Sequence, residues 1–235
     1  MGDGFSHWLP IRDKRNQQQK LVLFDLDGTL IDSIDDLADS TNYALQECGL
    51  PLHTVEEYKY FVGNSVDPLI RRALPKEDQD NQELFDRVKK IYLSRYAAHS
   101  KDKTKPYPGI ANLLSQCNKE GVLIAVVSNK PDDITADVVR YYFPQIHFAA
   151  TMGQKEGIPK KPDPAGVREV LRLTGIDPKD SLYVGDTWVD MQTAQNSGVK
   201  SCGVLWGFRT RQELEDNHAD DIAANVKELT EIIFK

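Results

Sequence analysis

The chain has 235 residues, of which 40% are hydrophobic and 28% are charged, and its formal net charge is −7 at pH 7. It is long enough to bury a core, and its acidic balance argues against a nucleic-acid-binding surface. No stretch approaches the roughly 18 consecutive apolar residues of a membrane span, so we expect no membrane partner. Cys48, Cys117 and Cys202 are widely spaced, with no C-x-x-C pair. We therefore expect reduced thiols in a cytoplasmic protein.

The first segment, residues 1–20, is polar and lacks the apolar stretch of a signal peptide. We expect a disordered extension here and place the fold in the residues that follow.

Five short apolar runs in the remaining sequence predict β-strands, and they are nearly continuous rather than alternating. They comprise residues 21–26, 122–128, 146–150, 181–184 and 201–205. Continuous apolar runs are typical of a parallel sheet that is covered on both faces.

Helical patterns separate the later strands. Ile110, Leu113, Leu114 and Cys117 follow the i, i+3, i+4, i+7 spacing of one helical face. Further helices are predicted at residues 134–142, 164–174 and 188–197. This alternation predicts an α/β fold, with a doubly wound, Rossmann-like parallel sheet.

One long segment interrupts the alternation. Residues 34–103 contain helical patterns but no strand-like run, and they are too many for one crossover helix. We expect an inserted helical domain of residues 33–105 within a catalytic core of residues 21–32 and 106–235. The return passage KPYPGI, residues 105–110, suits a hinge.

Polar side chains follow each of the first four predicted strands. In chain order they are Asp25 and Asp27; Ser128, Asn129 and Lys130; Lys161; and Asp186 with Asp190 one helical turn later. Ligands of open α/β sheets bind outside the carboxyl ends of the strands, so we expect these groups to meet there. Singly, the aspartates and Ser128 could cap a turn or a helix, and Lys161 could be an ordinary solvated lysine.

The chemistry of this set is consistent. Clustered carboxylates repel each other unless a cation joins them, and an all-oxygen ligand set favours a hard cation, Mg²⁺ or alternatively Mn²⁺. A lysine and a serine hydroxyl suit a phosphoryl group. A carboxylate can attack phosphorus to form an aspartyl-phosphate, and a second carboxylate can move the proton.

Four sequence motifs resemble those of the haloacid dehalogenase superfamily in order and spacing. They are Asp25-Leu26-Asp27-Gly28-Thr29, Ser128, Lys161 and Gly185-Asp186 with Asp190. The likeness extends over residues 21–235, and the helical insertion resembles the helical cap of that superfamily.

The resemblance implies roles for the four aspartates. Asp25 would be the nucleophile and a Mg²⁺ ligand. Asp27 would be the general acid/base, and its backbone carbonyl would bind the metal. Asp186 would be a further metal ligand, and Asp190 would support the site from the water shell of Mg²⁺ or by orienting Lys161.

The resemblance also implies how a phosphorylated substrate would bind. Ser128, Asn129 and Lys161 would hold the phosphoryl group. In the cap segment VGNSVDPLIRRAL, residues 62–74, Asn64 or the nearby Arg71 would meet the far end of the substrate.

Several segments resemble the phosphoglycolate phosphatase branch of the superfamily. They are TLIDS, SNKP, KKPDP and LWGF. The leading hypothesis is therefore a Mg²⁺-dependent phosphatase of a small phosphorylated metabolite, with 2-phosphoglycolate as the expected substrate.

Other functions remain open at this stage. A phosphomutase similar to β-phosphoglucomutase would use the same residues, and pyrophosphate is a further candidate substrate. A non-catalytic binding protein is a third alternative, although no motif residue is missing. Asp27 argues against dehalogenation, which needs no protonated leaving oxygen, and Lys59 is unremarkable as a phosphonatase lysine. The chain could be a monomer or a homodimer.

Overall fold

The structure is a computed structural model that describes residues 20–235. Apart from Lys20, the polar extension expected at residues 1–20 lies outside the described residues. Among the helices of the described part, none is long and apolar enough to cross a membrane.

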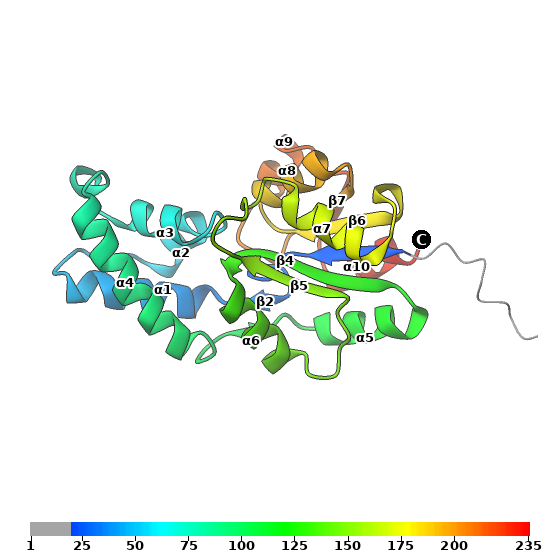
Figure 1. The fold of residues 1–235 in the computed structure, drawn as a ribbon, viewed down its shortest axis with the longest axis horizontal. Coiled ribbons are helices and arrows are strands. Elements are labelled where there is room, and N and C mark those ends of the chain that lie inside the picture. Colours follow the sequence, from blue (N-terminus) through cyan, green and yellow to red (C-terminus); the bar gives the residue numbers. More distant parts are fainter. Residues whose placement is uncertain (1–19) are drawn as a thin grey trace, which may run out of the picture.

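A six-stranded parallel sheet forms the centre of the fold (Figure 1). Its strands are β1 (Leu21–Phe24), β4 (Leu123–Pro131), β5 (Ala150–Gln154), β6 (Ser181–Gly185), β7 (Lys200–Val204) and β8 (Asp221–Ala223). The order β5-β4-β1-β6-β7-β8 runs outward in both directions from β1, which is the doubly wound arrangement. The predicted fold class is therefore confirmed.

The position of β1 within the sheet explains why its sequence is apolar throughout. Leu21–Phe24 pairs with β4 on one side and with β6 on the other, and every side chain in it is buried. Leu21 and Leu23 face one apolar cluster, whereas Val22 and Phe24 face the other. A strand with two buried faces cannot alternate between polar and apolar residues.

Helices cover both faces of the sheet. The Leu21/Leu23 face packs against α7 (Ala165–Thr174) and α8 (Trp188–Ser197). The Val22/Phe24 face packs against α5 (Ile110–Glu120), α6 (Asp132–Tyr142) and α10 (Val226–Ile233). The structure also has a short helix, α9 (Arg211–Asp216), and two 3₁₀ turns, Lys76–Asp78 and Pro178–Asp180.

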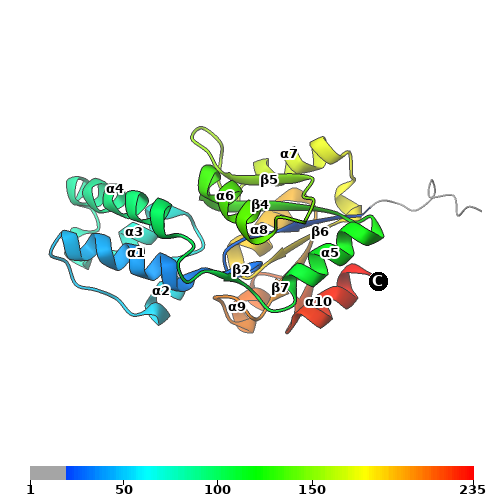
Figure 2. The same ribbon diagram turned by 90° about the horizontal axis from the view of Figure 1, so that it is seen from below.

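Four helices lie together to one side of the sheet (Figures 1 and 2). They are α1 (Ile34–Glu47), α2 (Val55–Phe61), α3 (Val66–Ala73) and α4 (Gln82–His99). Helix α2 begins with a capping box, in which Thr54 and Glu57 each accept a backbone N–H of the other. We refer to α1–α4 below as the helical region.

The segments through which the chain enters and leaves the helical region lie side by side. Strand β2 (Ile31–Asp32) pairs antiparallel with β3 (Lys105–Pro106). Next to this ribbon, the buried carboxylate of Asp36 accepts hydrogen bonds from the backbone N–H groups of Lys103 and Thr104. The outgoing and returning segments are thus held together at one place.

The strand boundaries differ from the prediction at one edge of the sheet. The strand expected at residues 146–150 lies instead at Ala150–Gln154, because Ile146 and Phe148 pack on the core from a loop. All five residues of β5 are partly exposed, so its apolar signal is weak. Strand β8 and helices α9 and α10 were not predicted.

Candidate active site

The polar strand ends expected to meet do so around Asp25. This residue directly follows β1, and its backbone N–H donates to the Val184 carbonyl of β6 at 2.9 Å. Its carboxylate is buried, with Oδ1 accepting the Leu26 backbone N–H at 2.7 Å. Asp25 therefore lies at the carboxyl end of a central strand of the sheet.

Three buried carboxylates converge at this point. Oxygen atoms of Asp25, Asp186 and Asp190 all lie within 4.8 Å of one another. Burial raises the pKa of Asp25 to about 7, although the nearby Lys161 ammonium acts in the opposite direction. Burial, together with Asp190 and Asp25, also raises the pKa of Asp186 well above its ordinary value. Such a cluster favours a bound cation.

Asp186 is enclosed by the chain around it. Its Oδ1 accepts the Thr29 hydroxyl at 3.0 Å, and its Oδ2 accepts the Phe208 backbone N–H at 2.8 Å. A Cβ atom added at Gly28, where φ is +81°, would lie 2.3 Å from Asp186 Oδ2. One added at Gly207 would lie 2.3 Å from Asp186 Cβ. Neither position has room for a side chain.

Lys161 is the cation inside this cluster. Its Nζ lies 3.0 Å from Asp25 Oδ1 and 2.8 Å from Asp190 Oδ1, and it donates to the Tyr183 hydroxyl at 2.9 Å. Burial alone would lower the pKa of Lys161, but the carboxylates of Asp190 and Asp25 outweigh it and raise the pKa well above its usual range. Lys161 is therefore charged and held between two carboxylates.

Two neighbours fix the position of Lys161. The Asn129 side-chain amide pairs with the Lys161 backbone, accepting its N–H at 2.9 Å and donating to its carbonyl at 3.1 Å. Asp190 Oδ2 accepts the Thr187 N–H and hydroxyl at 3.0 and 2.8 Å, leaving Oδ1 for Lys161. Of the two roles expected for Asp190, this geometry is that of orienting Lys161.

Asp27 is held by a lysine for which the sequence analysis gave no role. The Lys130 ammonium lies 2.8 Å from Asp27 Oδ1 and 3.1 Å from Oδ2, and Ser33 donates to Oδ1 at 2.5 Å. Lys130 also donates to the hydroxyl of Tyr96 in α4. Its place directly after Ser128 and Asn129, at the same strand end, was the available signal.

A cavity opens between the sheet and the helical region. The core contributes a polar floor that includes Asp25, Asp27, Ser128 and Lys130. The helical region contributes a mostly apolar wall, whose members include Leu37, Val62, Leu69, Tyr92 and Tyr96. The cavity suits a small ligand with one strongly polar end.

The two residues expected to meet the far end of a substrate are placed differently from one another. Asn64 lies beside the cavity-lining residues Gly63 and Ser65, and its buried Oδ1 has no hydrogen-bond partner among the described residues. The Arg71 guanidinium donates to the Gln79 carbonyl at 2.6 Å and stacks on the Phe85 ring at 3.8 Å. The structure does not bring Arg71 to the cavity.

Arg209 joins the two parts of the molecule and was missed by the sequence analysis. Its buried guanidinium donates to the carbonyls of Lys59 and Val62 at the end of α2, the latter at 2.9 Å. Its Nε lies 3.3 Å from Glu213. These contacts couple residues 147 or more positions apart, which no local pattern reveals.

Comparisons with known proteins agree on one family. The family model of the haloacid dehalogenase-like hydrolases matches residues 22–204. A phosphoglycolate phosphatase of Pseudomonas putida is 36% identical over 193 residues, which cover 80% of this chain and 70% of that protein. A phosphoglycolate phosphatase of Vibrio vulnificus is 30% identical over 222 residues, covering 93% and 97% of the two chains.

A solved structure is similar across nearly its whole length. A protein from Lactobacillus delbrueckii subsp. bulgaricus, described as a candidate phosphoglycolate phosphatase, superposes with a TM-score of 0.86. The two sequences are 32% identical, and the match covers 92% of this chain and 99% of the other.

Proposed function

The chain belongs to the haloacid dehalogenase-like hydrolases and is a phosphoric monoester hydrolase similar to phosphoglycolate phosphatases, and from this premise we propose that it hydrolyses 2-phosphoglycolate with Mg²⁺ through an aspartyl-phosphate at Asp25. The observation that carries the proposal is the convergence of Asp25, Asp186 and Asp190 around the single ammonium of Lys161. The names of the relatives support the substrate.

The donor set fits a hard divalent cation. Three buried carboxylates share one lysine ammonium, which leaves them short of positive charge. Carboxylate and carbonyl oxygens are the ligands that Mg²⁺ prefers. Asp25, Asp186 and the backbone carbonyl of Asp27 would hold it. When bound, Mg²⁺ would offset the charge between the phosphoryl group and these carboxylates.

The attacking atom follows from the contacts of Asp25. The Leu26 N–H and the Lys161 ammonium both contact Oδ1. We assign the other oxygen, Oδ2, as the nucleophile. Lys161 and Ser128 would hold the non-bridging phosphoryl oxygens, whose charge would otherwise repel the carboxylate.

The reaction then needs two proton transfers, both assigned to Asp27. In the first step Asp25 Oδ2 bonds to phosphorus, the bond from phosphorus to the glycolate oxygen breaks, and Asp27 gives that oxygen its proton. In the second step Asp27 takes a proton from water, whose oxygen bonds to phosphorus. The bond from phosphorus to Asp25 breaks, and inorganic phosphate leaves.

We propose that the helical region, within residues 33–105, acts as a cap. Its side chains form one wall of the cavity, as Leu37, Val62 and Tyr96 illustrate. Closing this wall over a bound substrate would exclude bulk water from the aspartyl-phosphate until the second step.

The test is inorganic phosphate release from 2-phosphoglycolate, pyrophosphate and hexose phosphates, each with Mg²⁺ and with EDTA. We expect Mg²⁺-dependent release that strongly favours 2-phosphoglycolate. Asp25→Asn should lose essentially all turnover while its circular dichroism spectrum stays that of the parent. Near-normal turnover in this variant would refute the nucleophile. Isomerised sugar phosphate in place of free phosphate would identify a mutase.

A further inference from the structure

A substrate that carries a carboxylate next to its phosphate brings two anionic groups into the cavity. The catalytic residues account for the phosphate end only. This inference rests on the proposed function and concerns the group that would receive the second anion.

The cations closest to the reacting groups are already engaged. Lys161 is held between Asp25 and Asp190. Lys130 directs its ammonium to both carboxylate oxygens of Asp27 and to the Tyr96 hydroxyl. An ammonium has three N–H donors, so these contacts use all of them.

Arg209 is also engaged, because its guanidinium is committed to backbone carbonyls at the end of α2 and to Glu213. None of these three cations can turn to a substrate carboxylate without breaking a contact that organises the site.

Lys160 differs from the other three. Its Nζ donates to the Ser65 hydroxyl at 3.0 Å. Within the part of the chain that the structure describes, no carboxylate forms an ion pair with it. One hydroxyl contact leaves two of its three N–H donors for a ligand.

The Ser65 hydroxyl holds this ammonium at the edge of the cavity. Lys160 itself is exposed and lines a second pocket, which shares Ser128 and Asn129 with the cavity. Ser65 lines the cavity together with Asp25 and Ser128, and it precedes α3 with φ of +84°. That left-handed conformation is costly for a residue other than glycine and is typical of functional sites. Lys160 thus reaches from the core to the opposite wall at a residue that borders the ligand space.

The position of Lys160 in the chain provides cations for both ends of a bound substrate. It directly precedes Lys161, so one short segment supplies a cation to the phosphate end and another to the opposite wall. The backbone of this segment is fixed by the paired hydrogen bonds between Asn129 and Lys161. The backbone from which the two lysine side chains extend is therefore set by the fold.

We propose that Lys160 is a specificity-determining residue, whose ammonium, placed by the Ser65 hydroxyl, receives the carboxylate of the substrate. The preferred substrates are then small phosphate monoesters with a second anionic group close to the phosphate. A charge-assisted contact of this kind also joins the substrate to the helical region, because Ser65 belongs to its wall.

The test compares two substrates that differ in the second group alone. 2-Phosphoglycolate carries a carboxylate where 2-hydroxyethyl phosphate carries a neutral hydroxymethyl group. In Lys160→Met, we expect KM for 2-phosphoglycolate to rise about tenfold or more, as the loss of one charge-assisted hydrogen bond predicts. KM for 2-hydroxyethyl phosphate should change less than about twofold, and Lys160→Arg should retain most of the preference.

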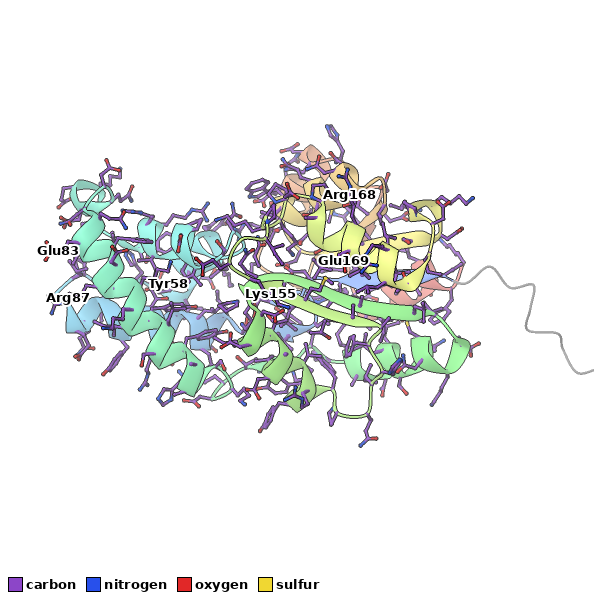
Figure 3. All side chains as sticks on the ribbon, in the orientation of Figure 1. Tyr58, Glu83, Arg87, Lys155, Arg168 and Glu169 are labelled. Carbon is purple, nitrogen blue, oxygen red and sulfur yellow. The ribbon has the colours of Figure 1, made fainter. Side chains whose placement is uncertain are left out.

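Lys155→Met is the matched control. Lys155, labelled in Figure 3, lies five positions earlier and forms an ion pair with Asp132 at 3.2 Å, and we expect both substrates to be unaffected by its loss. An equal loss on both substrates in Lys160→Met would indicate a structural role and overturn the inference.

The remaining outcomes separate this inference from the proposed function. A preference for the carboxylate that survives in Lys160→Met overturns the inference alone. A parent enzyme without that preference overturns the proposed substrate together with the inference.

Discussion

Replacing Lys161 by methionine tests the electrostatic account of the site without relying on turnover. The Lys161 Nζ lies 3.0 Å from Asp25 Oδ1 and 2.8 Å from Asp190 Oδ1, and all three groups are buried. At an effective dielectric constant of about 20, each contact contributes roughly 5–6 kcal/mol of attraction. Desolvation of the charges offsets most of this gain.

The net effect depends on what the substitution leaves behind. Methionine fills a similar volume but leaves Asp25, Asp186 and Asp190 without a cation. Removing one partner of a buried ion pair costs about 3–5 kcal/mol. We therefore expect the free energy of unfolding of Lys161→Met in EDTA to fall by about that amount.

Urea unfolding followed by circular dichroism, in EDTA and in Mg²⁺, measures this cost. Mg²⁺ should stabilise Lys161→Met more than the parent, because the variant cluster lacks its own cation. The control is Lys179→Met, because Lys179 is exposed and 3.6 Å from Asp177, and its loss should change stability by less than about 0.5 kcal/mol. A loss below about 1 kcal/mol in Lys161→Met, or an equal Mg²⁺ effect in variant and parent, would refute the account.

Two further predictions concern pH and the contact between the two parts. In EDTA, the folded state keeps a proton on Asp25 up to about pH 7, whereas the unfolded chain releases it near 3.8, so this group's contribution to stability is lost as pH rises between these values. Urea midpoints at several pH values should therefore fall more steeply with pH for the parent than for Asp25→Asn, and equal slopes would contradict the burial argument. Arg209→Met removes the cation that joins Glu213 and the carbonyl of Val62, so we expect a lower melting temperature and a higher KM with a smaller change in kcat. Unchanged KM and melting temperature would show that this contact does not position the cavity wall.

The fold class could be predicted because its evidence is local. The buried strand at Leu21–Phe24 has no polar residue, and the helices before and after β4 show clear apolar spacing. Strand β8 has three residues, Asp221–Ala223, too few for any periodicity to register. Strand β5 was misplaced because the more apolar segment before it packs on the core as a loop.

The convergence of the candidate site residues could be predicted for a different reason. Asp25 and Asp186 directly follow β1 and β6, and Lys161 lies in the loop after β5; a parallel sheet brings its strand ends to one edge. Lys130 pairs with a carboxylate 103 positions away, and Arg209 with a carbonyl 147 away. The Arg209 contact depends on how the helical region lies against the sheet, which spacing along the chain does not encode, whereas Lys130 and Asp27 meet at the ends of the paired strands β4 and β1.

The paired segments at Ile31–Asp32 and Lys105–Pro106 bear on how proteins of this architecture diversify. The chain enters and leaves the helical region through paired strands, and Asp36 joins the two segments further. A change in the length of the helical region would therefore not alter the distance between its two connections to the sheet. Such a change would alter the cavity wall that the helical region contributes, while the polar residues at the strand ends stay in place. Substrate preference can then change through the helical region alone, without a change in the residues proposed to act on the phosphate.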